Sequence, residues 1–92
     1  MPNGWTCFLK QDQNVIRIRC SNGNTLRMAL MVRRALPNTN YDLILYAEPG
    51  HNAYMEYSVG LKEGLMAFLL HCGYGVGEII EEANRLNLQI VE

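Results

Sequence analysis

The residues best suited to chemistry in this chain are arginines that alternate with apolar residues in its first half. Residues 15–20 read V-I-R-I-R-C, and after Ser-Asn-Gly residues 24–32 read N-T-L-R-M-A-L-M-V. Arginine binds phosphates and carboxylates through paired hydrogen bonds, and alternate residues of a strand lie on one face of a sheet. The pattern therefore predicts a basic surface that binds an anionic partner.

Other aromatic and basic residues extend this predicted surface. Phe8 can contact an arginine through a cation–π interaction, and arginine and aromatic residues are enriched at binding interfaces. The predicted site, for a protein partner or for the backbone of RNA or DNA, consists of Phe8, Lys10, Arg17, Arg19, Arg27, Arg33 and Arg34.

The histidines and cysteines do not form a catalytic or metal-binding motif. His71 and Cys72 are adjacent, so on a helix their side chains would point about 100° apart. His51 is isolated, and the three cysteines are widely spaced without a C-x-x-C motif, which favours reduced, buried thiols. We therefore predict a protein that is not an enzyme and that holds neither a metal nor a cofactor.

Three other patterns are better explained by structure than by activity. The glycines of G-Y-G-V-G at 73–77 follow a predicted helix, whereas a dinucleotide-binding loop follows a strand. Residues 61–86 resemble a helix-turn-helix in outline, but three glutamates on the second helix would repel DNA phosphates. Asp42, Glu48 and Glu56 are expected on an open sheet face rather than in a cleft, which favours solvated carboxylates.

Charge is divided between the two halves of the chain, although the formal net charge is only −1. Residues 1–40 hold six basic residues and one acidic residue, a balance of +5. Residues 41–92 hold two basic and eight acidic residues, a balance of −6. Such asymmetry indicates either a charged partner or two halves that fold against each other.

The length of 92 residues is typical of one domain, spanning 1–92, with a single core. No apolar run approaches the length that crosses a membrane, and the N-terminus lacks the regions of a signal peptide. We therefore expect a cytoplasmic protein without a membrane partner.

Alternating apolar and polar residues predict strands, and a change to helical spacing after Gly60 predicts helices. We expect an α+β fold in which a five-stranded antiparallel sheet, largely a meander, is covered on one face by two C-terminal helices. The expected strands span 4–10, 15–20, 24–34, 41–47 and 53–59. The expected helices span 61–72 and 76–86, Gly73 ends the first of them, and 88–91 form either a short strand or a packed tail.

The turns set the expected register of the strands. A three-residue loop at 21–23 places Ile18 opposite Leu26 and Arg17 opposite Arg27. This register separates apolar from basic residues, whereas a two-residue loop would mix them on each face.

The other two hairpins are expected to place apolar residues on the same inner face. Pairing Lys10 with Val15 does so in the first hairpin, and it places Phe8 opposite Arg17. In the last hairpin, the turn at 49–51 is expected to pair Leu43 with Tyr57 and Leu45 with Met55.

In size, single-domain organisation, absence of motifs and uneven charge, the whole chain resembles small phage-encoded inhibitors such as anti-CRISPR proteins. The resemblance implies a non-enzymatic viral protein that sterically blocks a nucleic-acid or nucleoprotein complex in the host cytoplasm. It implies a host protein or ribonucleoprotein as partner, with the arginines competing for guide or target backbone. Because it rests on overall properties, it assigns no residue.

The alternative function is a homo-oligomeric or protein-interaction module whose basic face is neutralised internally. The arginines would then pair with Asp42 and Glu56, and a homodimer would form through the fifth strand or through Tyr46 and Tyr54. Salt-dependent binding of RNA or DNA would favour the first function. A mass that depends on concentration would favour the second.

Overall fold

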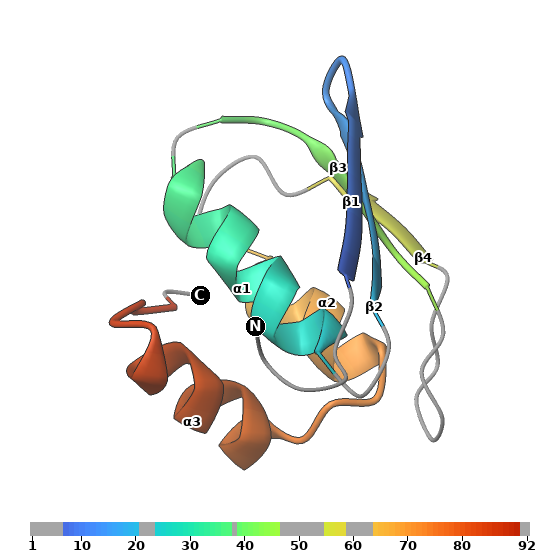
Figure 1. Cartoon of the computed structure of the whole chain (residues 1–92). Helices are drawn as coiled ribbons and strands as arrows, with labels where there is room; N and C mark the ends of the chain where they lie inside the picture. The colour runs from blue at the N-terminus through green and yellow to red at the C-terminus, as the bar shows by residue number, and fades with distance from the viewer. Residues whose placement is uncertain (1–6, 21–23, 38, 47–54, 59–63, 91–92) are drawn as a thin grey trace.

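The computed structural model describes residues 7–20, 24–37, 39–46, 55–58 and 64–90, and its helices cover one side of a sheet (Figure 1). We call the helix side of the sheet the inner face and the opposite side the outer face. Within the described residues the strands are β1 Cys7–Asp12, β2 Val15–Cys20, β3 Asp42–Leu45 and β4 Met55–Ser58. The helices are α1 Thr25–Ala35, α2 Leu65–His71 and α3 Val76–Arg85.

The sheet is mixed and has the strand order β1-β2-β3-β4. β1 and β2 are antiparallel, as are β3 and β4, whereas β2 and β3 are parallel. The α+β class is confirmed, but the expected five-stranded antiparallel sheet with two C-terminal helices is wrong. A parallel pair needs a crossover connection, and α1 supplies it between β2 and β3.

Helix α1 replaces the expected third strand at 24–34, because the residues of this segment also fit a helical period. Leu26, Ala29, Leu30 and Arg33 are buried at spacings i, i+3, i+4 and i+7. Leucine, arginine, methionine and alanine are strong helix formers, whereas strands favour β-branched and aromatic residues. Composition therefore outweighs the short alternation of polar and apolar residues.

The strand pairs expected from the lost third strand do not form. Arg27 lies on α1 and not opposite Arg17, and Ile18 pairs with Leu9 of β1 and Leu45 of β3. The expected three-residue loop at 21–23 lies outside the described residues.

The first hairpin forms, but with a shorter turn than expected. Only Gln13 and Asn14 connect the strands, and Asp12 pairs with Val15, so the expected pairing of Lys10 with Val15 is wrong. Gln13 has φ = 57°, in the left-handed region that tight hairpin turns use. The shorter turn shifts β1 by two residues against β2 and preserves which residues face inward.

A disulfide joins the two strands of this hairpin at the rung where Cys7 lies opposite Cys20. Their Cα atoms are 4.1 Å apart. The prediction of reduced cysteines is wrong for this pair, because the expected register placed Cys7 opposite Ile18. Cys72 is free and buried, as expected.

The second hairpin has the expected register. Leu43 pairs with Tyr57 and Leu45 pairs with Met55, in strands that lie within the expected ranges. The turn residues at 49–51 predict this pairing from the sequence, and the turn itself lies outside the described residues.

The C-terminal helices also follow the sequence. Gly73, at φ = 103°, adopts the left-handed conformation that ends α2. Ile79 and Ala83 form the buried side of α3. Leu88 and Ile90 pack against the core without forming a strand, so 88–90 are a packed tail.

A single cluster of buried side chains joins the inner face to the helices. Ile18 and Leu43 of the sheet are fully buried in it with Leu30 of α1, Leu69 of α2 and Ile79 of α3. No helix within the described ranges is long and apolar enough to span a membrane.

Candidate functional site

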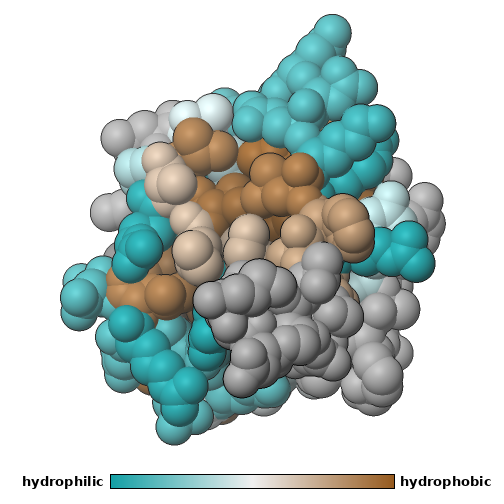
Figure 2. Space-filling model, viewed as in Figure 1, coloured by the Kyte–Doolittle hydropathy of each residue, from teal (hydrophilic) through white to brown (hydrophobic). Residues whose placement is uncertain are grey.

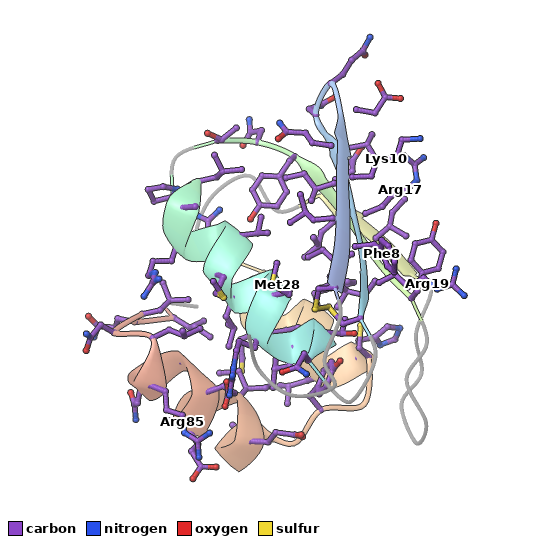
Figure 3. All side chains as sticks on the ribbon, in the orientation of Figure 1. Phe8, Lys10, Arg17, Arg19, Met28 and Arg85 are labelled. Carbon is purple, nitrogen blue, oxygen red and sulfur yellow. A yellow bond between two sulfur atoms is a disulfide. The ribbon has the colours of Figure 1, made fainter. Side chains whose placement is uncertain are left out.

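The outer face carries the predicted basic residues of the first hairpin. Because Ile18 is buried in the core, its neighbours Arg17 and Arg19 point to the outer face. Lys10 pairs with Arg17, and Phe8 pairs with Arg19 rather than with Arg17 as expected. Directly opposed residues lie on the same face, and these four side chains project from the sheet away from the helices (Figure 3).

A depression of about 370 Å³ on the outer face is lined by Phe8, Lys10, Arg17, Arg19 and Tyr46, and we call it the basic pocket. The N–H of Tyr46 donates to the carbonyl of Ile18 over 3.1 Å, which extends the β2–β3 ladder by one residue. This brings Tyr46 beside Arg19, whose Cζ atom is 6.0 Å from the centre of the tyrosine ring. That distance is at the outer limit of a cation–π contact.

Nothing acidic neutralises the basic pocket within the described part of the chain. Its lining holds three cations and no carboxylate, and no ion pair joins Lys10, Arg17 or Arg19 to a described acidic side chain. Of the two expected internal partners, Asp42 forms no ion pair with a described residue, and the side chain of Glu56 lies outside the part of the chain that the structure describes. Lys10 and Arg17 are directly opposed, and like charges in this position destabilise a sheet. An anion bound in the pocket would relieve this repulsion.

Arg27 does not belong to the basic pocket, because α1 directs it to the helical layer. Its Nε donates to Oε2 of Glu82 on α3 over 2.9 Å. This hydrogen bond holds the pKa of the Glu82 carboxyl below its ordinary value. Arg27 is therefore paired within the chain, with Glu82 rather than with Asp42 or Glu56.

Arg33 and Arg34 also serve the fold. Arg33 is buried, and its Nη2 donates to the carbonyl of Pro37 over 2.8 Å. Arg34 donates from Nη1 to the carbonyl of Leu86 over 2.6 Å, at the C-terminal end of α3. The structure thus brings together four of the seven predicted site residues and assigns three to contacts within the helical layer or its loops.

Tyr46 is the pocket residue that the sequence did not predict. In the expected antiparallel meander the strand at 24–34 would separate Tyr46 from Arg19, and only the parallel pairing of β2 with β3 brings Tyr46 beside Arg19. The alternation of 41–47 does predict that Tyr46 points outward, but it cannot predict which strand is the neighbour.

The remaining candidates for chemistry do not converge in the described part of the chain. No group of three or more histidine, cysteine or acidic side chains is placed there to hold a metal ion. Burial raises the pKa of the Cys72 thiol to about 11, which opposes formation of a reactive thiolate. His71, its neighbour in sequence, is exposed. The basic pocket is therefore the candidate functional site.

Comparison of the chain with models of protein families, with curated proteins and with solved structures found no match in any of the three.

Proposed function

We propose that this chain is a non-enzymatic binding protein whose basic pocket binds single-stranded nucleic acid. The observation that carries the proposal is the composition of the pocket on the outer face: its described lining residues supply three cations, two aromatic rings and no carboxylate. Neither a deep cleft nor a catalytic cluster accompanies it among the described residues, so binding is the function that its chemistry supports best.

The cations and the rings have complementary roles in this proposal. Lys10, Arg17 and Arg19 neutralise phosphates and release their counterions, which provides most of the affinity of such proteins. Phe8 is 67% exposed and offers a ring face on which an unpaired base can stack. Tyr46, partly exposed beside Arg19, offers a second ring. A duplex keeps its base faces covered, so this combination favours a single strand.

The proposed mode of action is steric. A protein of this kind would inhibit a nucleoprotein complex by covering the guide or target strand, as the resemblance to small phage-encoded inhibitors implies. The proposal needs no reaction at the site, because occupation of the strand is sufficient.

Binding to labelled oligonucleotides tests the proposal. We would measure fluorescence anisotropy with a single-stranded oligothymidylate and a single-stranded oligouridylate, and with a duplex as comparison. The variant Arg17→Gln/Arg19→Gln should lose at least about tenfold in affinity, and the slope of log K against log salt should fall by about 1.4. The matched control is Arg85→Gln, an exposed arginine on α3 that lies away from the outer face (Figure 3).

The control variant should bind like the unmodified protein. Failure of the unmodified protein to bind either single strand would overturn the proposal. Equal losses of oligonucleotide affinity in Arg17→Gln/Arg19→Gln and in Arg85→Gln would also overturn the proposal, because they would show that affinity depends only on the overall charge of the protein.

A further inference from the structure

Strand β1 forms one edge of the sheet, and the backbone groups that it turns outward can be identified. The backbone N–H of Tyr46 donates to the carbonyl of Ile18, so the backbone N–H and C=O of Ile18 point toward β3. Its neighbour Arg19 therefore faces β1, since the direction of the backbone groups alternates along a strand. It follows that Leu9, opposite Ile18, directs its N–H and C=O away from β2. No described strand lies on that side to receive them.

Apolar side chains accompany this open edge. Leu9 is 44% exposed although it points to the inner face, because α1 packs against β2 rather than against β1. Met28 of α1 is only partly buried beside the core. Figure 2 shows an apolar surface between α1 and β1, bordered by the polar tip of the first hairpin. An edge strand with exposed apolar side chains is a template for pairing with another strand.

We infer that a second copy of this chain pairs with β1 in an antiparallel arrangement, with Leu9 of each copy opposite Leu9 of the other. In this register the outward backbone groups of both leucines form hydrogen bonds with each other, and the two side chains cover one another on the inner face. Phe8 of each copy lies opposite Lys10 of the other on the outer face.

The side chains of β1 favour this register over the one centred on Lys10. If the centre of the pairing moved from residue 9 to residue 10, Lys10 of one copy would lie opposite Lys10 of the other, and the two positive charges would repel each other. In the inferred register each lysine meets a phenylalanine ring, an attractive cation–π pair that forms twice by symmetry. The strand is therefore complementary to itself, and this argues for a second copy rather than an unrelated strand.

Pairing would complete the basic pocket with a residue from the second copy. The second copy's Lys10 would lie beside Phe8, and the two pockets would adjoin on one outer face of eight strands. A single strand of nucleic acid would then meet a site about twice as long as that of one copy. The dimer itself does not depend on nucleic-acid binding, so it can be tested without a ligand.

The oligomeric state, measured by sedimentation equilibrium without nucleic acid, tests the inference. The unmodified chain should change from monomer to dimer as its concentration rises. Leu9→Lys would place two lysines opposite each other and should raise the dimer dissociation constant at least about tenfold. The matched control is Leu70→Lys, because Leu70 on α2 is a leucine of nearly equal exposure, 43%. This control should dimerise normally, and circular dichroism should show that both variants fold.

Cross-linking tests the register. In the inferred dimer the Cα atoms of residue 9 are about 5.5 Å apart, a distance that a disulfide can span. Leu9→Cys should therefore form a covalent dimer on mild oxidation, and peptide mass spectrometry should locate the bond at residue 9. The two copies of residue 12 would be about 20 Å apart, so Asp12→Cys should not cross-link.

A chain that is monomeric at every accessible concentration would overturn the inference. So would a dimer that tolerates Leu9→Lys but not Leu70→Lys, because it would use another surface. Cross-linking of Asp12→Cys as readily as Leu9→Cys would overturn the register. If the dimer forms but does not bind oligonucleotides, the inference stands and the proposed function fails.

Discussion

Nε of Arg27 donates to Oε2 of Glu82 over 2.9 Å, and this contact ties α1 to α3. Arg85 donates to the other carboxylate oxygen of Glu82 over 3.0 Å. The contact joins a helix from the basic half of the chain to a helix from the acidic half. Part of the charge asymmetry in the sequence is therefore explained by folding. Among the described residues, Lys10, Arg17 and Arg19 have no acidic partner and lie together on the outer face.

Replacing Glu82 by glutamine should lower the free energy of unfolding by about 1 kcal/mol. The carboxylate is mostly buried, with 16% of its side chain exposed, but Arg27 is 38% exposed and solvent screens the pair. Thermal and urea unfolding would measure the change. Glu81→Gln is the control, because Glu81 is 71% exposed and its 3.8 Å pair with Arg85 should contribute little. Equal effects of the two substitutions would contradict the prediction.

The same pair should make stability depend on pH in the acidic range. The hydrogen bond from Arg27 lowers the pKa of Glu82 from its ordinary value of 4.5 in the folded state. The stabilisation is therefore complete above pH 4.5 and is lost as the pH falls through the lowered pKa. The difference in melting temperature between the unmodified chain and Glu82→Gln should shrink as the pH falls below this value. A difference that stays constant into strong acid would contradict the assignment.

The fold was predictable where turn residues set the pairing of two strands. In the second hairpin, Pro49 and Gly50 mark the turn in the sequence, so the pairing of Leu43 with Tyr57 could be predicted. In 24–34, leucine and methionine satisfy both the strand period and the helix period. The strong helix propensity of these residues favours the helix. Burial of both Ala29 and Leu30 agrees with it, because adjacent residues of a strand point to opposite faces.

The candidate site was predictable only in part for a related reason. Phe8, Lys10, Arg17 and Arg19 share a face in any antiparallel register that keeps the apolar residues inside, so an error of two residues did not separate them. Tyr46 enters the site through the β2–β3 pair, which depends on a crossover that the sequence does not reveal once α1 is mistaken for a strand.

Replacing Gly73 by alanine should destabilise the chain by about 1–2 kcal/mol. Gly73 has φ = 103° at the end of α2, and this conformation is unfavourable for a residue with a Cβ atom. Gly77→Ala is the matched control, because Gly77 lies within α3 and a Cβ atom there meets nothing within 4 Å. That substitution should stabilise the chain by about 0.4–1 kcal/mol. Thermal unfolding that shows the same sign for both substitutions would contradict the role assigned to Gly73.

Reduction of the disulfide should destabilise the first hairpin and the chain. Cys7 and Cys20 are 13 residues apart in sequence, and closing a loop of this size contributes about 2–4 kcal/mol. Cys7→Ser/Cys20→Ser should lower stability by this amount, and a reducing agent should not lower it further. Intact mass should show two fewer hydrogens in the unmodified chain before reduction. A mass that does not change on reduction would show that the bond is absent.

Phe8 should contribute to the binding of single-stranded nucleic acid and not to the binding of a duplex. If a base stacks on Phe8, Phe8→Ala should weaken binding of single-stranded oligothymidylate by about 1–3 kcal/mol. Phe8→Tyr should keep most of the affinity, because it retains the ring. Binding to a duplex should change little, since the base faces of a duplex are covered and only its phosphates are accessible.

Val76→Ala is the control for this prediction, because Val76 is an apolar residue on α3 with 55% of its surface exposed. It should leave binding unchanged. Anisotropy titrations at two salt concentrations would separate stacking from charge, because loss of a neutral ring should leave the salt slope unaltered. Two results would contradict this prediction: an equal loss of affinity for the single strand and the duplex in Phe8→Ala, or a smaller slope of log K against log salt. Either would show that Phe8 positions the arginines and does not stack on a base.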